Sequence, residues 1–479
     1  MRLRRRDLLQ SAAAALGAGG AHAQTRPMPA FPLRAAPDRR YLVDRDGKPF
    51  FILGDSPQAI YAAITPAEVE DYLAFRQAQG FTALLADPAF SNNNDGFVRP
   101  AANGHFPFLR NGQGGRYDGA SGTADFATPD PAYWDYVDTV LARAEARGFL
   151  VLQYVLAWGY GGKTMWRDLV NPRNGRDVCF AFGQFLGRRF RDRANVIWID
   201  GSDFNGDDQP CAPDGSSGIA RALAVAEGMR AAGAAQLRTG DWMADSLATD
   251  QPAFAPLIGL NGIYAYGDKV GHNATYFQAR RAYRHRPTLP AFLKETGYEA
   301  EHLIGGDPAS VRKYEWWCLL SGATAGVVYG HGDIWRFVQG RWQAALRAPG
   351  GADMQRLGAL MRSLAWHDLV PADLAGMRRL VVSASGAADP PIPDYVAAAQ
   401  TRDGRLLVAY VPPFGDGAQR LTLDLGGMAA RAAATWWDPT SERTQTAGRL
   451  APGTRPSLVT PGRNAAGAND WVLLLQAGL

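Results

Sequence analysis

Short apolar runs alternate with longer segments of helical periodicity along the chain as far as about residue 372. The runs are rich in β-branched and aromatic residues, as in Val196-Ile-Trp-Ile199, which is typical of buried parallel strands. We expect eight such strands, at residues 50–55, 81–86, 149–155, 196–199, 236–242, 257–266, 289–295 and 325–330. The helices between them begin at typical capping sequences, such as Thr65-Pro66 and Asp130-Pro131.

Eight strand–helix units predict a (β/α)8 TIM barrel over residues 38–372. A doubly wound sheet is the competing architecture, but no Gly-rich dinucleotide turn follows any of the strands. Before the barrel, Asp46-Gly47 predicts a hairpin turn. After it, residues 373–479 carry short strands separated by turn residues and no helical period, which predicts an all-β sandwich.

The N-terminus has the pattern of an export signal. Arg5-Arg6-Asp7-Leu8-Leu9 resembles the twin-arginine consensus, and Ala21-His22-Ala23 is typical of a cleavage site. We therefore expect residues 1–23 to be a signal peptide, residues 24–37 to be a linker, and the mature protein to be periplasmic or secreted. No apolar run approaches the roughly 20 residues that span a membrane.

Composition narrows the function classes. The formal net charge of +4 comes mostly from arginines in residues 1–23, so nucleic-acid binding has no electrostatic support. The three cysteines, Cys179, Cys211 and Cys318, and the histidines lack metal-ligand spacing, so we expect no metal and no cofactor. For Cys211, both a free thiol and a disulfide fit the sequence pattern. Aromatic residues make up 11% of the chain, which serves core packing or stacking on sugar rings. We expect a monomer.

Two carboxylates follow strands that would face each other across the barrel mouth. Asp203 comes after the strand at 196–199, and Glu295 ends the strand at 289–295. A protonated and an ionised carboxyl flanking one bond are what glycoside hydrolysis needs. We predict that Asp203 is the acid/base and Glu295 the nucleophile. Asp200 and Glu299 are the alternatives, and strand alternation predicts that Lys294 points away from Glu295.

Further polar and aromatic residues at strand ends are candidates for substrate binding, with a structural role as the alternative for each. Asp55 either contacts substrate or bonds the first loop, and the aromatic rings either stack on sugar or pack internally. The candidates are Asp55, Trp158, Asp241, Trp242, Tyr264, Tyr266, Tyr298, His331 and Trp335. The Gly/Asn-rich loop at 92–122 is a candidate rim over the site.

Several of these motifs together resemble a known family. Gly54-Asp55-Ser56, the stretch from Asn195 to Asp203, Glu295-Thr-Gly-Tyr-Glu299 and Tyr329-Gly-His-Gly-Asp-Ile-Trp335 are similar to the DUF4038 proteins, which include the apiosidase-like glycoside hydrolases of family 140. The tail, with Trp436-Trp-Asp-Pro439, resembles that family's collagen-binding-type accessory domain. The resemblance implies a barrel glycosidase that cleaves pectin side chains, with catalytic carboxylates at Asp203 and Glu295.

The sequence therefore predicts an exported, retaining glycoside hydrolase that acts on plant cell-wall oligosaccharides. The main alternative is a carbohydrate-binding protein that keeps the barrel cleft without turnover. A matrix-binding protein is a further alternative, which rests only on the resemblance of the tail.

Overall fold

The computed structural model describes residues 28–90, 99–110, 124–159, 165–203, 215–266, 275–301, 306–372, 380–383 and 395–478. The predicted signal peptide, Cys211 and most of the loop at 92–122 lie outside these residues. Near the start, β1 (Arg34–Ala35), β2 (Leu42–Val43) and β3 (Pro49–Phe50) form a small antiparallel sheet. The turn between β2 and β3 contains Gly47 with φ of 83°, which confirms the predicted hairpin.

Eight parallel strands form the barrel that the alternating pattern predicts. They are β4 (Ile52–Asp55), β5 (Ala83–Ala86), β6 (Leu150–Tyr154), β7 (Val196–Gly201), β8 (Arg238–Asp241), β10 (Asn261–Tyr264), β11 (Ala291–Glu295) and β12 (Gly326–Tyr329). A short strand, β9 (Ser246–Leu247), runs antiparallel to β10. The barrel closes between β8 and β10 where Gly259 N and Leu260 N donate to Arg238 O, at 2.9 and 3.1 Å.

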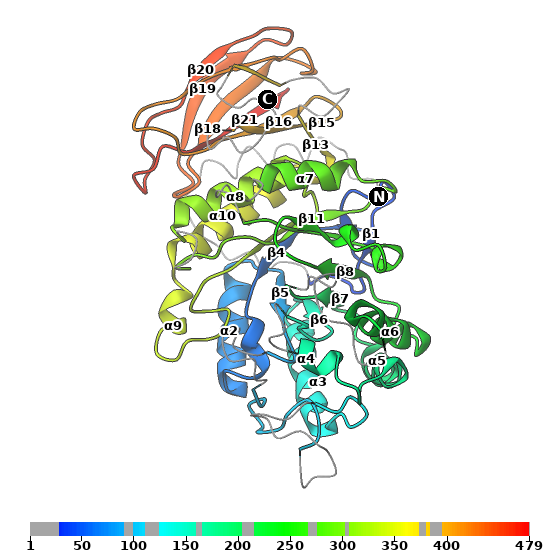
Figure 1. Cartoon of the computed structure of the whole chain (residues 1–479). Coiled ribbons are helices and arrows are strands. Elements are labelled where there is room, and N and C mark those ends of the chain that lie inside the picture. The colour runs from blue at the N-terminus through cyan, green and yellow to red at the C-terminus, as the bar shows by residue number, and fades with distance from the viewer. Residues whose placement is uncertain are drawn as a thin grey trace, which may run out of the picture.

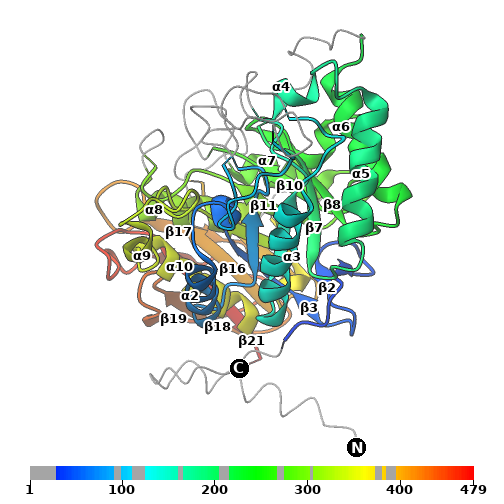
Figure 2. The same cartoon turned by 90° about the horizontal axis from the view of Figure 1, so that it is seen from below.

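Helices cover the outside of the barrel, as Figures 1 and 2 show. The longer ones are α2 (Pro66–Ala78), α3 (Pro131–Ala146), α5 (Arg176–Phe190), α6 (Gly218–Ala231), α7 (Thr275–Arg284), α8 (Pro308–Leu320) and α10 (Pro349–Ser363). The shorter ones are η1 (Gln58–Tyr61), α4 (Trp166–Leu169), η3 (Ala248–Asp250), η4 (Ala255–Leu257), α9 (Trp342–Ala345) and η5 (Trp366–Asp368). Thr65 and Glu68 form a reciprocal capping box at the start of α2, and Asp130 caps α3, as their sequences predict.

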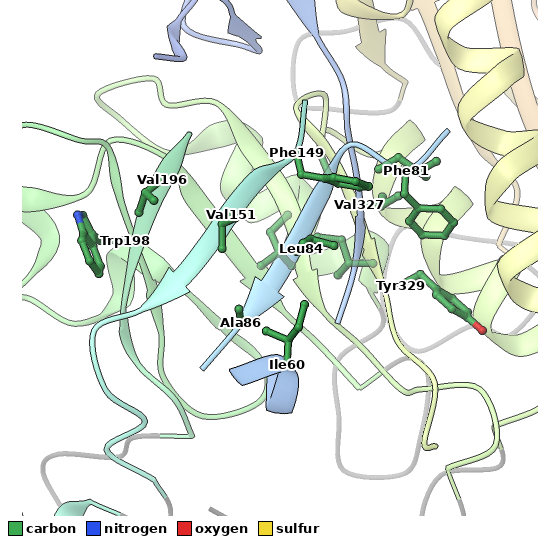
Figure 3. Packing of buried hydrophobic residues seen from close by; sticks show 14 of the residues in the cluster. Ile60, Phe81, Leu84, Ala86, Phe149, Val151, Val196, Trp198, Val327 and Tyr329 are labelled. Carbon is green, nitrogen blue, oxygen red and sulfur yellow. The ribbon is translucent and has the colours of Figure 1, made fainter. Parts of the chain in front are cut away.

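Strand alternation divides the apolar residues into two layers. Residues such as Leu84, Val151 and Val327 face the helices and pack with side chains from η1 and the other surrounding elements (Figure 3). Alternate residues, such as Leu85 and Leu152, fill the barrel interior instead. The barrel is therefore a packed core, and only its rim is open to a ligand.

Two antiparallel sheets follow the barrel and confirm the predicted sandwich. One has the order β13 (Leu369–Pro371), β15 (Ala397–Thr401), β16 (Leu406–Val411), β21 (Trp471–Ala477), β18 (Ala432–Trp437), β19 (Thr444–Leu450). The other has the order β14 (Val381–Ser383), β17 (Arg420–Leu423), β20 (Ser457–Val459). The six-stranded sheet thus takes its first strand from just before the domain boundary predicted at residue 373. The sheets lie over α7, α8 and α10 (Figure 1).

Candidate active site

The end of β7 makes an unusual turn that carries Asp203. Gly201, Ser202 and Asp203 have φ of 102°, 92° and 48°, a region that side chains other than glycine rarely adopt. A Cβ at Gly201 would lie 2.0 Å from the carbonyl oxygen of Asp241, so only glycine fits there. Ser202 N donates to this oxygen at 2.7 Å. Strained backbone held by neighbouring strands is a feature of functional sites.

A pocket opens at the carboxyl ends of the strands. Both predicted catalytic carboxylates, Asp203 and Glu295, line it, and the two are partly exposed. Four of the predicted substrate-binding residues line it with them: Asp241, Tyr266, Tyr298 and Trp335. The remaining lining residues are Gln58, Asp87, Phe90, Tyr154, Ala157, Ser202 and Glu301.

Glu295 is held by two donors. The hydroxyl of Tyr298 donates to its Oε1 at 2.9 Å, and the ammonium of Lys294 donates to its Oε2 at 2.5 Å. Tyr298 is fixed in turn by Ser56 at 2.8 Å and by Gln58 at 3.1 Å. The carboxylate of Glu295 therefore has a defined orientation and a cation beside it.

The prediction that Lys294 points away from Glu295 is wrong. Tyr264 pairs with Glu295 and Ile263 with Leu293, so Lys294 is the extra residue of a bulge in β11, and simple alternation fails there. Its side chain is fully buried and its ammonium also bonds Asp241 Oδ1 at 2.7 Å. Burial by itself lowers the pKa of Lys294, but the charges of Asp241 and Glu295 outweigh burial and raise the pKa above its ordinary value.

Asp203 accepts a hydrogen bond from the hydroxyl of Tyr264 at 2.9 Å. Desolvation, together with the negative charges of Asp241 and Glu295, raises the pKa of Asp203 to about 7, against the opposing effect of Lys294. A carboxyl with this pKa is present in both its protonated and its ionised form near neutral pH. Asp203 can therefore donate a proton and take one back.

Asp241 lies at the end of β8 and lines the same pocket as Asp203. The hydroxyl of Tyr154 donates to its Oδ2, and Lys294 contacts its Oδ1. Desolvation raises the pKa of Asp241 to about 6, although the Lys294 ammonium opposes this shift. Tyr264, which donates to Asp203, lies with its ring centroid 4.1 Å from the Lys294 ammonium.

Five predicted substrate-binding residues do not line the pocket. One of them is Tyr264, which donates to Asp203. Asp55 is fully buried and accepts hydrogen bonds from Tyr72 and Arg76 of α2, both at 2.6 Å, which favours its structural alternative. The indole of Trp242 donates to Ala248 O at 2.9 Å. Trp158 is buried in the barrel–helix layer. His331 Nδ1 accepts from Asp333 N at 3.0 Å.

The two alternative carboxylates also have structural partners. Asp200 faces the helix layer and pairs with Arg238, whose Nη2 lies 2.6 Å from Asp200 Oδ1. Glu299 accepts from the hydroxyl of Tyr329 at 2.5 Å and from Gly350 N, at the start of α10, at 3.0 Å. Neither carboxylate lines the pocket.

Asp87 is a pocket residue that the sequence analysis does not single out. It follows β5, is 3% exposed, and accepts from Ala89 N at 2.9 Å. Burial raises the pKa of Asp87 to about 7, against its backbone hydrogen bonds. Its position after Ala86 at the end of an apolar run is the same signal that identifies Asp203 and Glu295.

Among the residues that the structure describes, no group of three or more His, Cys, Asp or Glu side chains is arranged to hold a metal ion. None of the described helices is long and apolar enough to cross a membrane. Cys179 and Cys318 are buried thiols, and Cys179 Sγ donates to Asn174 O at 3.2 Å.

The comparisons with known proteins show the family of the barrel and the fold of the chain. Residues 36–368 match the family model of the apiosidase-like catalytic domain. No curated protein matches the chain. A solved structure described as a glycoside hydrolase superposes with a TM-score of 0.73 at 20% identity, covering 94% of this chain and 99% of that one. A glycoside hydrolase family 5 protein from Bacteroides vulgatus ATCC 8482 gives the same TM-score and identity and covers 93% of each chain.

Proposed function

The chain belongs to the family of apiosidase-like catalytic domains and is a glycoside hydrolase, and from that premise we propose that it cleaves pectin side-chain oligosaccharides with retention of configuration, using Asp203 as acid/base and Glu295 as nucleophile. The observation that carries the proposal is that these two carboxyls line one pocket in different surroundings. Asp203 has a raised pKa, whereas Glu295 is bonded to an ammonium and a phenol. A retaining glycosidase needs such a difference between its two carboxyls.

The first step breaks the glycosidic bond. Asp203 gives its proton to the glycosidic oxygen as the bond between that oxygen and the anomeric carbon breaks, and a Glu295 oxygen forms a new bond to the anomeric carbon. The leaving alcohol departs with the proton, and the sugar remains as an ester of Glu295. The two hydrogen bonds from Lys294 and Tyr298 hold the attacking carboxylate toward the pocket.

The second step releases the sugar. Asp203, now ionised, takes a proton from water while the water oxygen bonds to the anomeric carbon and the ester bond to Glu295 breaks. Asp203 ends protonated and Glu295 ends ionised, as at the start. The hydroxyl of Tyr264 stays on Asp203 Oδ1 and orients the carboxyl through both steps.

Aromatic side chains of the pocket support a carbohydrate ligand. Tyr266 and Trp335 are partly exposed there, so their rings are available to stack on the apolar face of a sugar. Membership of a catalytic-domain family favours turnover over a binding protein without activity. The apiose residue of the substrate rests on the family, and the pectin side chain rests on the resemblance of the sequence motifs.

The test uses rhamnogalacturonan fragments and the variants Asp203→Ala and Glu295→Gln. We expect each variant to lose about 10²–10⁴-fold in kcat, because each removes one of the two catalytic groups. The control is Glu299→Gln, which changes a buried carboxylate outside the pocket and retains activity. Proton NMR of the first anomer released checks retention. Undiminished hydrolysis by either catalytic variant removes that residue from the mechanism.

Export is a separate part of the proposal and rests on Arg5-Arg6 and Ala21-His22-Ala23. We expect the mature protein outside the cytoplasm to begin at Gln24. N-terminal sequencing of the exported protein checks this, and an intact Met1 on that protein would contradict it.

A further inference from the structure

A buried ammonium lies directly under the catalytic pocket. Lys294 is fully buried, and its Nζ stands between Asp241 Oδ1 at 2.7 Å and Glu295 Oε2 at 2.5 Å. Asp241 is also buried, at 1% exposure. A lysine ammonium is seldom removed from water unless it is paired, because the charged form loses its hydration. Here the two carboxylates supply the compensation.

The contacts of Lys294 connect the two catalytic carboxyls. On one side the ammonium bonds Glu295. On the other it lies 4.1 Å from the ring centroid of Tyr264, whose hydroxyl bonds Asp203 at 2.9 Å. Asp241 pairs with the ammonium and is itself held by the hydroxyl of Tyr154. Four barrel strands, β6, β8, β10 and β11, each contribute a group to this network, and Asp203 comes from the turn after β7.

We propose that Lys294 and Asp241 are positioning residues that act as a charge-balanced pair. The ammonium of Lys294 fixes the nucleophile Glu295. The opposite charges of the two residues together make Asp203, rather than Glu295, the carboxyl that carries the catalytic proton. The inference rests on the proposed roles of Asp203 and Glu295. Neither residue of the pair reacts. Lys294 is buried beneath Glu295, and it acts on the bond-breaking step only through that carboxylate and through Asp203.

The opposite signs of the pair make its effect measurable. The Asp241 charge raises the pKa of Asp203, and the Lys294 charge lowers it. Together they leave this pKa at about 7, a value suited to a group that both gives and takes a proton near neutrality. Other titratable groups face the same network and stay in place in both variants: Tyr154, Tyr264, Tyr266, Glu295, Tyr298 and Glu301.

The experiment compares pH–rate profiles of Lys294→Met, Asp241→Asn and the double variant in the full-length enzyme, with methyl β-D-apiofuranoside as the probe. Its methanol leaving group needs protonation, so the fall in kcat/KM at high pH reports loss of the Asp203 proton. We expect this limb near pH 7 in the natural protein. The limb moves up by about 1 pH unit in Lys294→Met, because this variant removes a positive charge that favours ionised Asp203. It moves down by about 1 pH unit in Asp241→Asn, because this variant removes a negative charge that disfavours ionised Asp203.

In the double variant both charges are absent and the limb returns toward its natural position. Lys294→Met also lowers kcat more than it raises KM, because Glu295 loses its anchor and substrate does not touch Lys294.

The matched control is Asp200→Asn, which breaks the buried pair with Arg238 outside the pocket. This control loses stability and leaves the limb unmoved. The double variant has no uncompensated buried charge, so it remains informative if a single variant fails to fold.

Limbs that stay in place in both single variants, or move in the same direction, overturn the inference. A raised KM in Asp241→Asn with an unmoved limb assigns Asp241 to substrate binding and has the same consequence. These results differ from failure of the proposed function. That failure appears as retained hydrolysis in Asp203→Ala or Glu295→Gln, whatever happens to the pH profile.

Discussion

The single turn after β7 shows how individual residues create this site. A buried strand ends in Gly201-Ser202-Asp203, and all three residues have positive φ. Gly201 is required because the carbonyl of Asp241 occupies the space of a side chain. The turn lifts Asp203 out of the strand register into the pocket. Asp200, three residues earlier, faces the helices and bonds Arg238 instead.

Asp87 provides a prediction at the same scale. Its carboxyl lines the pocket and has a pKa of about 7, so it can donate to or accept from a sugar hydroxyl. We expect Asp87→Ala to lower kcat/KM about 10-fold through loss of one hydrogen bond. Asp87→Asn, which keeps a donor and an acceptor, loses less. Steady-state kinetics with the rhamnogalacturonan fragment that the enzyme hydrolyses measure kcat/KM of both variants. Equal kcat/KM in Asp87→Ala and the natural protein would refute this contact.

Helix α8 is buried on all sides, and this burial includes an ionisable side chain. Its residues from Val311 to Leu320 are all buried, between the barrel strands and the C-terminal sheets. Glu315 is among them, and neither of its carboxyl oxygens has a hydrogen-bond partner in the described part of the chain. Burial raises the pKa of Glu315 well above its ordinary value. The folded protein therefore holds a proton there that the unfolded chain releases.

Because of this difference, the contribution of Glu315 to the free energy of unfolding depends on pH. The unfolded chain releases the proton above about pH 4.5, so the folded state loses stability as pH rises through that value toward the folded-state pKa. We expect Glu315→Met to raise the free energy of unfolding by about 2 kcal/mol at pH 4, where it removes an unpaired buried carboxyl, and by more at pH 7, where it also removes the cost of keeping that carboxyl protonated. Thermal unfolding at the two pH values measures this. A gain of the same size at both would mean that packing, rather than ionisation, is responsible.

At the scale of the element, sequence pattern predicts the barrel strands and most helices because each has one dominant periodicity. The strand β8 (Arg238–Asp241) is an extreme case, since Arg-Thr-Gly-Asp has no apolar residue, yet flanking positions suffice to predict it. The strands β19 and β20 are not predicted. Their residues are mostly exposed or partly exposed and carry no clear alternation, so only pairing with β18 and β17 makes them strands.

A buried polar contact links the barrel to the sandwich. Arg312 of α8 forms two hydrogen bonds with Asp470, at 2.7 and 2.8 Å, and a third with Asp353 of α10 at 2.6 Å. The hydroxyl of Tyr410 also donates to Asp470, and its ring stacks on Trp316 with centroids 5.8 Å apart. These contacts make the sandwich a support for the helices behind the barrel.

Removal of the Arg312 charge should uncouple the two parts. We expect Arg312→Met to lower the free energy of unfolding by about 3–5 kcal/mol, because two buried carboxylates lose a buried cationic partner. Arg356→Met is the matched control. Arg356 bonds the same Asp353 at 2.9 Å from a more exposed position, so its loss costs about 1 kcal/mol or less. Guanidinium unfolding measures both, and equal small losses would mean that the interface rests on its aromatic contacts alone.

Local pattern was sufficient to predict the barrel, the sandwich and two acidic strand ends, because strand and helix periods are properties of neighbouring residues. It left open which strand-end groups share the pocket. Asp55 faces Arg76 because helix α2 covers that side of β4. Lys294 bonds Glu295 because a bulge in β11 breaks the alternation. The proton on Asp203 depends on burial and on the charges of Asp241, Glu295 and Lys294, residues 38 to 92 positions away that only barrel closure brings together.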